Sequence, residues 1–505
     1  MSILGIDIGT TGVKAVIFSE NGKILGSGYK EYYVSYPKPG WAELDPKIVI
    51  ESVTQATKQA LKMNISNDQV QSLSVSTMGE VACPLSKKGE LLYNAILHFD
   101  KRGEEQNKFW ENFGKERIFK ITGMPLHSMY TLNKLLWLRD NEPQKFKKID
   151  RLPLLQDYFL YSLGLEPLID YSLASRTMAF DVINKKWSEE ILDYCQVDKK
   201  IFSKPVESGT IAGRLSSKAA LKLGLKKGVT VVVGTHDQPA ATLGSGVIKE
   251  GIAMDSTGTV ECVAVTIDEP NLNKILLDNN ITCYCHCIPG KFIVHGFVFS
   301  AGSILKWYRD TFADTEILRS KKLGIDAYEL ILKNVDNNPS SIFVLPHFSG
   351  SGTPYMDLMS KGILMGLTLN TSKSDIVKAI LEGISYEMML NINIMRKVGI
   401  KINELRAIGG GAKSDKWLQL KADIFGLPIV SLDVSEASCL GVAILAGKST
   451  GLFNSLEESI KAMVKEKKTY LPNEKRMFEY SNRMSIYSKI YDSTREISHQ
   501  IHKNL

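Results

Sequence analysis

The chain has 505 residues, of which 44% are hydrophobic and 23% are charged, and its formal net charge is +7. This length exceeds what one hydrophobic core usually serves, so we expect two or more domains. The modest charge and the lack of a dense lysine–arginine block argue against nucleic acid as a partner. The sequence shows no signal peptide, no apolar run long enough to cross a membrane, and seven cysteines, an odd number. These features predict a cytoplasmic protein without a disulfide framework.

The first segment reads as a strand, a turn and a second strand. An apolar run ends at Ile8, the turn is Gly9-Thr10-Thr11-Gly12, and the hairpin signal Asn21-Gly22 follows the second run. Glycines let a ligand approach the backbone, and amide and hydroxyl groups can hold phosphate oxygens. Asp7 at the strand end could hold Mg²⁺, and Lys14 would add positive charge. A plain hairpin that needs glycine explains the same residues, so this turn alone leaves both interpretations open.

A second turn of the same kind, Ser256-Thr257-Gly258-Thr259, follows a strand-like stretch that begins at Gly251. Two similar openings far apart in one chain predict two lobes with related cores. Such a pair of turns would suit a nucleotide that is bound from both sides. We therefore place the domain boundary near Gly244 to Gly251, with domains at residues 1–245 and 246–505.

Strand and helix patterns alternate along the chain. Leu73–Ser76 and Thr230–Gly234 read as short buried strands. The strongest helical pattern runs from Ser374, as the cap, to Lys397, and Gly399 ends it. This alternation predicts an α/β fold with mixed sheets.

Asp237 follows the strand at Val229–Val233 within Gly234-Thr235-His236-Asp237-Gln238. A carboxylate at a strand end is placed to accept a proton from a substrate hydroxyl as its oxygen attacks phosphorus. A helix cap is an equally good explanation of an aspartate at this position. We expect His236 to be structural or a hydrogen-bond partner of the base.

A glycine-rich segment, Gly409-Gly410-Gly411-Ala412-Lys413-Ser414, joins a strand at Leu405–Ile408 to a helix that carries Trp417. Three glycines and a helix N-terminus suit a nucleotide, because backbone N–H groups and a partial positive charge face the ligand. The segment matches neither the dinucleotide-binding fingerprint nor a P-loop.

Cys283, Cys285 and Cys287 alternate with other residues and admit two interpretations. Alternation puts the three thiols on one face of a strand. A zinc site would normally use wider spacing and a second pair of ligands. We therefore favour the strand over a metal site.

Taken in order, the four segments around Asp7, Thr257, Asp237 and Gly410 resemble the FGGY carbohydrate kinases of the actin-like ATPase superfamily. The resemblance extends over nearly the whole chain, through Ala95–Leu97, Asp100, Arg102, Thr122-Gly123, Lys134–Trp137, Asp170–Ser175, Gly302–Trp307, Gly362–Leu367 and Gly409–Ala443. It implies two lobes with ribonuclease-H-like cores around a central cleft. The sugar would be held mainly by the first lobe and ATP mainly by the second.

The resemblance also implies a role for each matching residue. Asp237 would be the general base, and Asp7 and Asp237 would hold Mg²⁺. The implied substrate contacts are Met78, Gly79, Glu80, Asp100, Arg102, Asp237 and Gln238. The implied ATP contacts are Gly9, Thr10, Thr11, Lys14, Thr257, Gly258, Thr259, Gly302, Gly410, Gly411, Ala412 and Ser414.

The departures from the family pattern concern the substrate. Xylulose and gluconate kinases tend to carry Met-His in the loop that reads Thr77-Met78-Gly79-Glu80 in this chain. Glycerol kinases carry Arg-Glu at the corresponding place, so Gly79 argues against glycerol. His98 stands where relatives usually have tryptophan, and Ser351-Gly352 replaces a charged pair. An anionic Glu80 slightly disfavours a sugar acid, because like charges repel. A ketopentose such as xylulose is therefore the favoured substrate, with gluconate or another polyol as the alternative.

A different class, an actin-like or chaperone-like ATPase without a sugar substrate, would share the phosphate turns and the adenosine segment. It would not be expected to place an Asp-Gln pair after a strand at the lobe junction. A homodimer is a further expectation from the family, and the polar helical segment from Glu474 to Leu505 would pack on the second lobe or on a partner.

Overall fold

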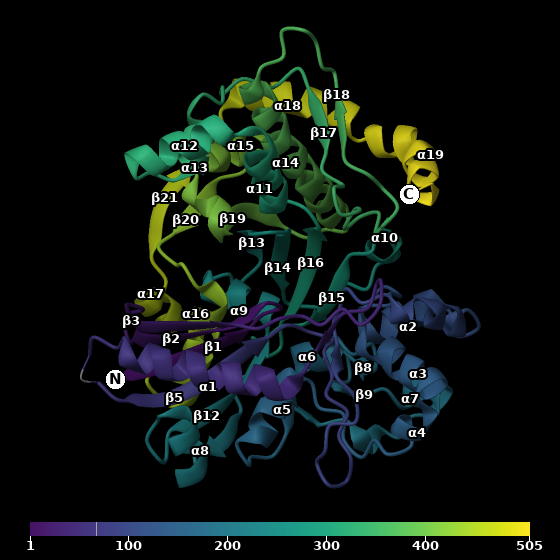
Figure 1. Ribbon diagram of the computed structural model, residues 1–505, viewed down its shortest axis with the longest axis vertical. Helices are drawn as coiled ribbons and strands as arrows, with labels where there is room; N and C mark the ends of the chain where they lie inside the picture. Colours follow the sequence, from purple (N-terminus) through teal and green to yellow (C-terminus); the bar gives the residue numbers. More distant parts are fainter. Residues whose placement is uncertain (67, 505) are drawn as a thin grey trace.

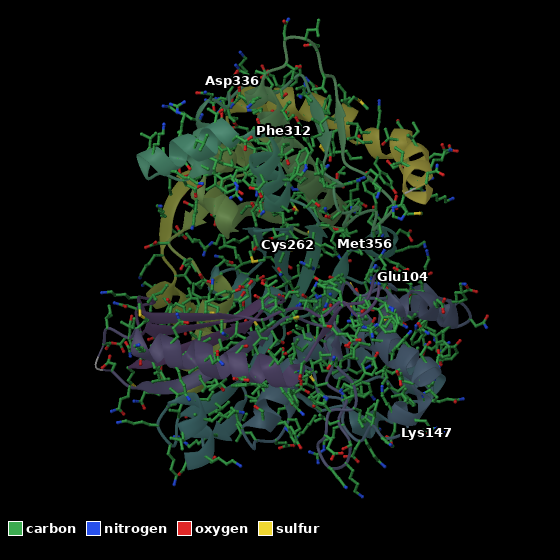
Figure 2. All side chains as sticks on the ribbon, in the orientation of Figure 1. Glu104, Lys147, Cys262, Phe312, Asp336 and Met356 are labelled. Atoms are coloured by element: carbon green, nitrogen blue, oxygen red, sulfur yellow. The ribbon has the colours of Figure 1, made fainter. Side chains whose placement is uncertain are left out.

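The computed structural model describes residues 1–66 and 68–504, which form two lobes that are each built around a large sheet (Figure 1). Phe312 and Asp336 lie in the lobe drawn at the top, and Glu104 and Lys147 lie in the lobe below it (Figure 2). Cys262, on a strand of the upper sheet, lies between them (Figure 2). The predicted α/β fold with two mixed sheets is confirmed.

The sheet of the first lobe has six strands in the order β11-β12-β5-β1-β2-β3. Its strands are β1 (Ser2–Ile8), β2 (Gly12–Ser19), β3 (Ile24–Glu31), β5 (Val70–Thr77), β11 (Ile211–Arg214) and β12 (Thr230–His236). Strand β1 is antiparallel to β2 and parallel to β5, and β12 is also parallel to β5. All residues of β12 are buried, as expected for a central strand rich in β-branched residues.

Helix α1 (Pro46–Lys62) covers one face of this sheet (Figure 1). Asp45 caps it by accepting a hydrogen bond from the N–H of Lys47 at 2.8 Å, and Pro46 occupies the first turn. Gly26 and Gly28 of β3 face α1, and a side chain at either would overlap the helix backbone at Ala60 or Ala56. The other helices of this lobe are α2 (Lys115–Thr122), α3 (Thr131–Asn141), α4 (Pro143–Phe146), α5 (Leu155–Ser162), α6 (Tyr171–Ser175), α7 (Glu189–Cys195), α8 (Ser217–Leu223) and α9 (Asp237–Gly244).

The sheet of the second lobe has seven strands in the order β15-β16-β14-β13-β19-β20-β21. Its strands are β13 (Gly251–Thr257), β14 (Glu261–Ile267), β15 (Thr282–Cys285), β16 (Phe292–Val298), β19 (Ile402–Ile408), β20 (Ile429–Leu432) and β21 (Glu466–Tyr470). The hairpin of β13 and β14 is the predicted second opening, and β19 runs parallel to β13. Paired short strands complete the chain, namely β4 (Glu43–Leu44) with β6 (Ala95–Ile96), β7 (Leu168–Asp170) with β10 (Lys204–Val206), β8 (Phe180–Asp181) with β9 (Lys186–Trp187), and β17 (Phe343–Leu345) with β18 (Ile363–Met365).

The long predicted helix is α14 (Lys373–Lys397), and the predicted cap at Ser374 is wrong by two residues. Ser372 is the cap because Asp375 completes a capping box with it, and each side chain bonds the other's backbone N–H. The other helices of this half are α10 (Lys274–Asp278), α11 (Gly302–Phe312), α12 (Asp314–Leu323), α13 (Ala327–Lys333), α15 (Asp415–Phe425), α16 (Ala437–Ser449), α17 (Leu456–Met463), α18 (Glu474–Tyr487) and α19 (Ile490–Lys503). Short 3₁₀ helices span Arg102–Trp110, Lys199–Ile201 and Gly410–Lys413.

Helix α16 joins the two lobes (Figure 1). It packs on the face of the first sheet opposite α1, where a side chain at Gly5 of β1 would overlap the backbone of Cys439. It also packs on α9, and glycines on both helices allow the close approach, since a side chain at Gly244 or Gly441 would overlap the partner helix backbone. The C-terminal part of the chain is therefore fastened to the first lobe.

The last two helices are fastened to the second lobe. Tyr480 and Tyr487 of α18 donate hydrogen bonds to Glu382 (3.0 Å) and Glu387 (2.6 Å) on α14, and all four side chains are buried. Packing on this lobe, one of the two predicted locations for the terminal segment, is confirmed.

The predicted strand ends at Cys285, before the third of the alternating cysteines. Cys283 and Cys285 lie on β15, and the seven cysteines of the chain are all buried and unpaired with one another. In residues 1–66 and 68–504 no group of three or more His, Cys, Asp or Glu side chains could hold a metal ion. Among the same residues, no helix has the length and apolar character needed to cross a membrane.

Candidate active site

Three parallel strands of the first sheet end side by side. Asp7 on β1 is in register with Ser76 on β5, and Thr77 of β5 is in register with His236 on β12. The carboxyl ends of parallel strands meet at one edge of a sheet, which is where α/β proteins place their ligands. Asp7, the segment after Thr77, and Asp237 are thereby brought together from widely separated parts of the chain.

Asp7 is held in place by its neighbour on β5. The hydroxyl of Ser76 donates a hydrogen bond to Oδ1 of Asp7 at 2.5 Å. Burial raises the pKa of Asp7 to about 6, although the Ser76 hydrogen bond acts in the opposite direction. The charge of Glu436 raises the same pKa further, whereas the charge of Lys14 lowers it.

Asp237 is the first residue of α9, and no side-chain hydrogen bond caps this helix. Nε2 of His236 lies 3.0 Å from Oδ1 of Asp237, but outside hydrogen-bonding geometry, so Oδ1 has no donor among the described residues. Burial raises the pKa of Asp237 to about 8, and the charges of Asp7 and Glu80 add to this effect. The side chain still has 31% of its surface exposed. A half-buried carboxylate with a raised pKa and a free oxygen has the properties of a general base.

His236, the last residue of β12, contacts the second lobe. Its Nδ1 lies 3.0 Å from the hydroxyl of Tyr284 on β15. Burial lowers the pKa of His236 well below its usual value, so the ring is neutral. Gln238, the other predicted substrate contact on α9, is half-buried and has no partner for Oε1 among the described residues.

Met78, Gly79 and Glu80 follow β5 directly, and Glu80 has a φ of 64°, in the left-handed region that non-glycine residues rarely adopt. The strained backbone is anchored, because the Glu80 carbonyl accepts hydrogen bonds from Oγ1 of Thr131 (3.0 Å) and Nζ of Lys134 (3.4 Å). Strained residues of this kind cluster at functional sites.

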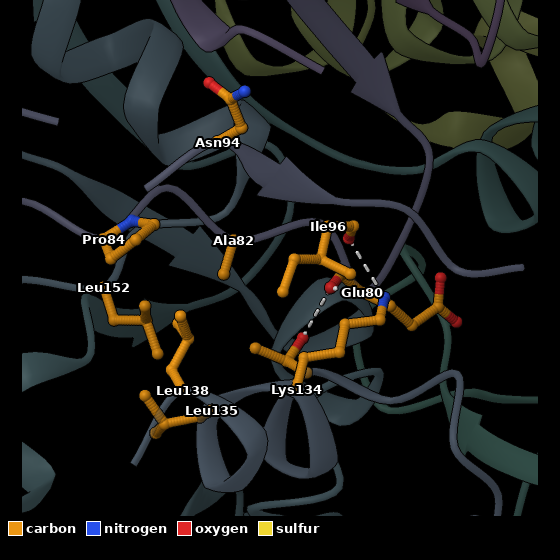
Figure 3. A pocket seen from close by; sticks show the side chains of 10 residues that line it. Glu80, Ala82, Pro84, Asn94, Ile96, Lys134, Leu135, Leu138 and Leu152 are labelled. Atoms are coloured by element: carbon orange, nitrogen blue, oxygen red, sulfur yellow. Dashed lines mark hydrogen bonds between the residues drawn. The ribbon is translucent and has the colours of Figure 1, made fainter. Parts of the chain in front are cut away.

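Lys134 lies beside a small cavity of about 20 Å³ that separates it from Leu152 and Pro84 (Figure 3). The Lys134 ammonium also donates to the carbonyl of Ile96 at 3.2 Å, whereas the Glu80 carboxylate points away from the cavity (Figure 3). Burial lowers the pKa of Lys134 to about 7. The lysine therefore ties the Glu80 segment to the strand that precedes His98.

Asp100 and Arg102, both predicted to contact substrate, form a buried ion pair. Nη2 of Arg102 lies 2.6 Å from Oδ2 of Asp100, and Nη1 lies 2.6 Å from Oε1 of Glu43. The guanidinium also stacks on Trp41 and Trp137, at 4.1 and 5.1 Å from the ring centroids. These contacts give the pair an internal role, and its contact with substrate stays a prediction.

The first glycine turn is narrow and braced. The N–H of Gly9 donates to the carbonyl of Gly12 at 3.0 Å, and the hydroxyl of Tyr32 donates to the carbonyl of Gly9. Thr10 is half-buried and Thr11 is exposed. Lys14, predicted to contact ATP, places Nζ 2.7 Å from both carboxylate oxygens of Glu436, so its charge is paired across the lobes.

A cavity of about 1160 Å³ lies in the second lobe. Residues that the sequence predicts as ATP contacts line it, namely Thr257, Gly258, Thr259, Gly302, Gly410, Gly411 and Ser414. Side chains that the sequence did not single out complete the lining, among them Lys306, Arg319, Leu323, Tyr328 and Lys416. Ala412 is half-buried but is not part of the lining.

The strand register also explains why the residues that line this cavity come together. Ser256 of β13 is in register with Ile408 of β19, so the second turn and the glycine segment leave the sheet at one edge. Gly409 has a φ of 83°, and a side chain there would meet the Thr257 carbonyl at 2.6 Å. Glycine is required at this position for both reasons.

Lys421 of α15, which no sequence pattern singles out, holds the second turn in place. Its Nζ lies 2.6 Å from Asp255, 2.6 Å from the hydroxyl of Thr257 and 3.1 Å from Glu261. All of these side chains are buried. The helix that follows the glycine segment is thereby tied to the second turn.

Arg176, just beyond the predicted motif Asp170–Ser175, is the main residue of the first site that sequence reasoning missed. Its Nε donates a hydrogen bond to Oε1 of Glu80 at 2.5 Å, and its guanidinium lies 5.2 and 5.4 Å from the ring centroids of Tyr130 and Tyr284. Its position directly after that motif is the only sequence feature that points to it.

Known proteins resemble the chain along nearly its full length. Sequence profiles of the FGGY family of carbohydrate kinases match the N-terminal domain at residues 2–244 and the C-terminal domain at residues 253–450. A xylulose kinase of Staphylococcus xylosus is 30% identical over 491 residues, covering 97% of this chain and 99% of that protein. A gluconokinase of Bacillus subtilis (strain 168) is 28% identical over 491 residues, covering 96% and 94%.

The fold comparison agrees. The structure of a ligand-bound xylulose kinase from Lactobacillus acidophilus superposes with a TM-score of 0.89 at 25% identity, over 98% of both chains. The chain therefore contains both domains of the family and matches the relatives in length. Polar residues lie where strands end in each of its two large sheets. The chain belongs to the FGGY family of carbohydrate kinases, enzymes that use ATP to phosphorylate small carbohydrates.

Proposed function

We propose that Asp237 is the general base of phosphoryl transfer from ATP to a hydroxyl of a small neutral sugar. The observation that supports this role is the free Oδ1 of Asp237, at the edge where three parallel strands end. A substrate hydroxyl that donates its hydrogen bond to this oxygen would lose its proton as its oxygen attacks phosphorus. His236 would orient the carboxylate and Tyr284 would orient His236.

Asp7 and Asp237 are the proposed ligands of Mg²⁺. Their oxygens are the hard donors that Mg²⁺ prefers, and Mg²⁺ in kinases is commonly held by one or two carboxylates together with waters and phosphates. The charge of Asp7 raises the pKa of Asp237, which fits a pair that shares a cation. A cation there would favour the ionised carboxylates and neutralise charge on the phosphates.

The ATP phosphates would lie between the two glycine turns, with Gly9, Thr10 and Thr11 on one side and Thr257, Gly258 and Thr259 on the other. Gly302, at the start of α11, donates its N–H to the carbonyl of Gly258 at 3.0 Å and so holds the second turn. Adenosine would occupy the cavity of the second lobe, against Gly410, Gly411 and Ser414. Ala412 would act through the backbone.

A ketopentose such as xylulose is the proposed substrate. The support comes from the xylulose kinases among the relatives, while the gluconokinase makes gluconate the second candidate. Gln238, with its free Oε1, is the proposed contact to a second hydroxyl, and Asp100 and Arg102 would support the wall of the site. A homodimer stays a prediction.

The test is ADP release from Mg-ATP in the presence of a panel of ketoses, aldoses, sugar acids and polyols. A single strong responder among the ketopentoses would support the proposal. A responder of another class would keep the kinase and replace the substrate. No response from any compound, although calorimetry shows that ATP binds, would contradict the proposed reaction.

A further inference from the structure

Arg176 is a buried cation in direct contact with the proposed sugar site. Its side chain has 5% of its surface exposed, and its partner Glu80 has 3%. Burial acts to lower the pKa of Arg176, but the charge of Glu80 and the rings of Tyr130 and Tyr284 raise it overall, so the guanidinium stays charged. Its charge also acts on Asp237, whose pKa it lowers.

The backbone before Glu80 leaves room for this arginine. A side chain at Gly79 would lie 3.1 Å from Cγ of Arg176 and 3.1 Å from the ring of His236. These distances are tighter than ordinary van der Waals contacts, and both neighbours are buried. Arg176 can therefore occupy its position because residue 79 is a glycine.

The ion pair leaves hydrogen-bonding groups of both kinds unused. Nε and Nη2 of Arg176 both contact Oε1 of Glu80, and no described residue donates a hydrogen bond to Oε2. The other hydrogen bonds of the guanidinium go to the thioether sulfurs of Met124 (3.6 Å) and Met129 (4.0 Å), which are weak acceptors. The free acceptor Oε2 of Glu80 therefore lies next to N–H donors of Arg176 that have only weak acceptors as partners.

The nearby histidines add no charge. Burial lowers the pKa of His98 and of His127 to about 4 and lowers the pKa of His295 to about 3. The histidine rings are therefore neutral, and the charges that act on Asp237 are those of Asp7, Glu80 and Arg176.

We propose that Arg176 is a specificity-determining residue that selects uncharged polyhydroxyl substrates over sugar acids, because its charge is already used by Glu80. A hydroxyl both donates and accepts, so it can satisfy Oε2 of Glu80 and an N–H of Arg176 together. A carboxylate only accepts. It would leave Oε2 unsatisfied and would place a second anion beside Glu80 and Asp237.

This inference rests on the proposed function and names its substrate class. It also revises the sequence argument, in which Glu80 alone repels acids through its charge. In the structure Arg176 neutralises that charge, and the discrimination comes from the mismatch of donors and acceptors. Removing the negative charge of Glu80 should therefore free Arg176 to bind an anion.

The test compares glucitol and gluconate, which share a carbon chain and differ in one terminal group, as substrates or as competitors of the preferred sugar. In the unmodified enzyme glucitol should be favoured. In Glu80→Gln the ratio of kcat/KM for gluconate to that for glucitol should rise by about tenfold or more, because Arg176 can now pair with the carboxylate. In the double variant Glu80→Gln, Arg176→Met this gain should disappear, while ATP affinity stays unchanged.

Glu190→Gln is the matched control, because Glu190 pairs with an arginine at the exposed surface. This variant should leave the ratio of kcat/KM for gluconate to that for glucitol unchanged. Thermal unfolding and ATP affinity, measured for each variant, identify a folding defect, and the double variant avoids a lone buried charge. Equal loss of activity on both compounds in Glu80→Gln, or an unmodified enzyme that prefers gluconate, would overturn the inference while leaving the kinase intact. No activity on any compound would instead overturn the proposed function, and the inference with it.

Discussion

Arg102 is surrounded by the carboxylates of Asp100 and Glu43 and by the rings of Trp41 and Trp137. Its side chain has 1% of its surface exposed. The resemblance to relatives assigns Arg102 to the substrate, whereas its observed contacts are internal. Removing the arginine would leave two buried carboxylates without a cation, which is among the most destabilising changes a core can suffer.

We therefore expect Arg102→Met to lower the free energy of unfolding by about 3–5 kcal/mol, as measured by urea denaturation. Arg151→Met is the control, because Arg151 and Asp150 are both exposed and such pairs contribute about 0–1 kcal/mol. A variant that unfolds like the original enzyme but has a much higher KM for sugar would instead support the direct contact with substrate.

Sequence could identify residues whose role follows from their place after a strand. Asp7 and Asp237 are such residues, because the end of a parallel strand is where a carboxylate meets ligand. Arg176 and Lys421 are different. Arg176 meets Glu80 across 96 residues of sequence, and Lys421 meets Asp255 across 166. Spacing carries no information on such contacts, since they depend on how separate elements pack.

At the scale of elements, the glycine segment after β19 contains neighbours with different roles. A side chain at Gly411 would lie 2.6 Å from Cβ of Thr257, whereas a side chain at Gly410 would have only the Thr257 carbonyl nearby, at 3.9 Å. Gly411 therefore allows the segment to pack on the second turn. Gly410 lines the cavity and is open to a ligand.

Gly410→Val should weaken ATP binding with little change in the melting temperature, because the new side chain enters the cavity without meeting the protein. Gly411→Val should weaken ATP binding and lower the melting temperature, because Thr257 must move. Calorimetric titration with ATP and thermal unfolding measure both effects. Unchanged ATP affinity in Gly410→Val would exclude this cavity as the adenosine site.

Elements with strong local patterns were predictable, and their ends were less so. The Asn21-Gly22 hairpin, the repeated opening at Gly251 and the long helix all follow from turn chemistry and apolar periodicity. The cap of that helix was misplaced because Ser372 and Ser374 are both suitable residues. Only the reciprocal bonds with Asp375 decide between them.

At the scale of the whole molecule, the two lobes are joined through α9 and α16, whose glycines meet backbone to backbone. Asp237 begins α9, and Glu436 immediately precedes α16 and pairs with Lys14. A movement of one lobe against the other would pass through these two helices. Closure would bring the phosphate turns together and exclude water that could otherwise accept the phosphoryl group.

We expect the radius of gyration from small-angle X-ray scattering to decrease when a non-hydrolysable ATP analogue and the sugar are added together. Either ligand alone should produce a smaller decrease, because each contacts mainly one lobe. The same radius with both ligands and with none would contradict closure. The predicted domain boundary near residue 245 is a separate prediction, which limited proteolysis of this linker region would test.

The central claim is that Asp237 takes the proton of the attacking hydroxyl. The measurement that tests it most directly is the turnover of Asp237→Asn on the preferred sugar, with calorimetric titration of ATP alongside and Asp278→Asn, an exposed residue, as the control. We predict a loss of turnover of about 10²-fold or more with ATP binding retained and the control unchanged. Turnover close to that of the unmodified enzyme would contradict the assignment of Asp237 as the base.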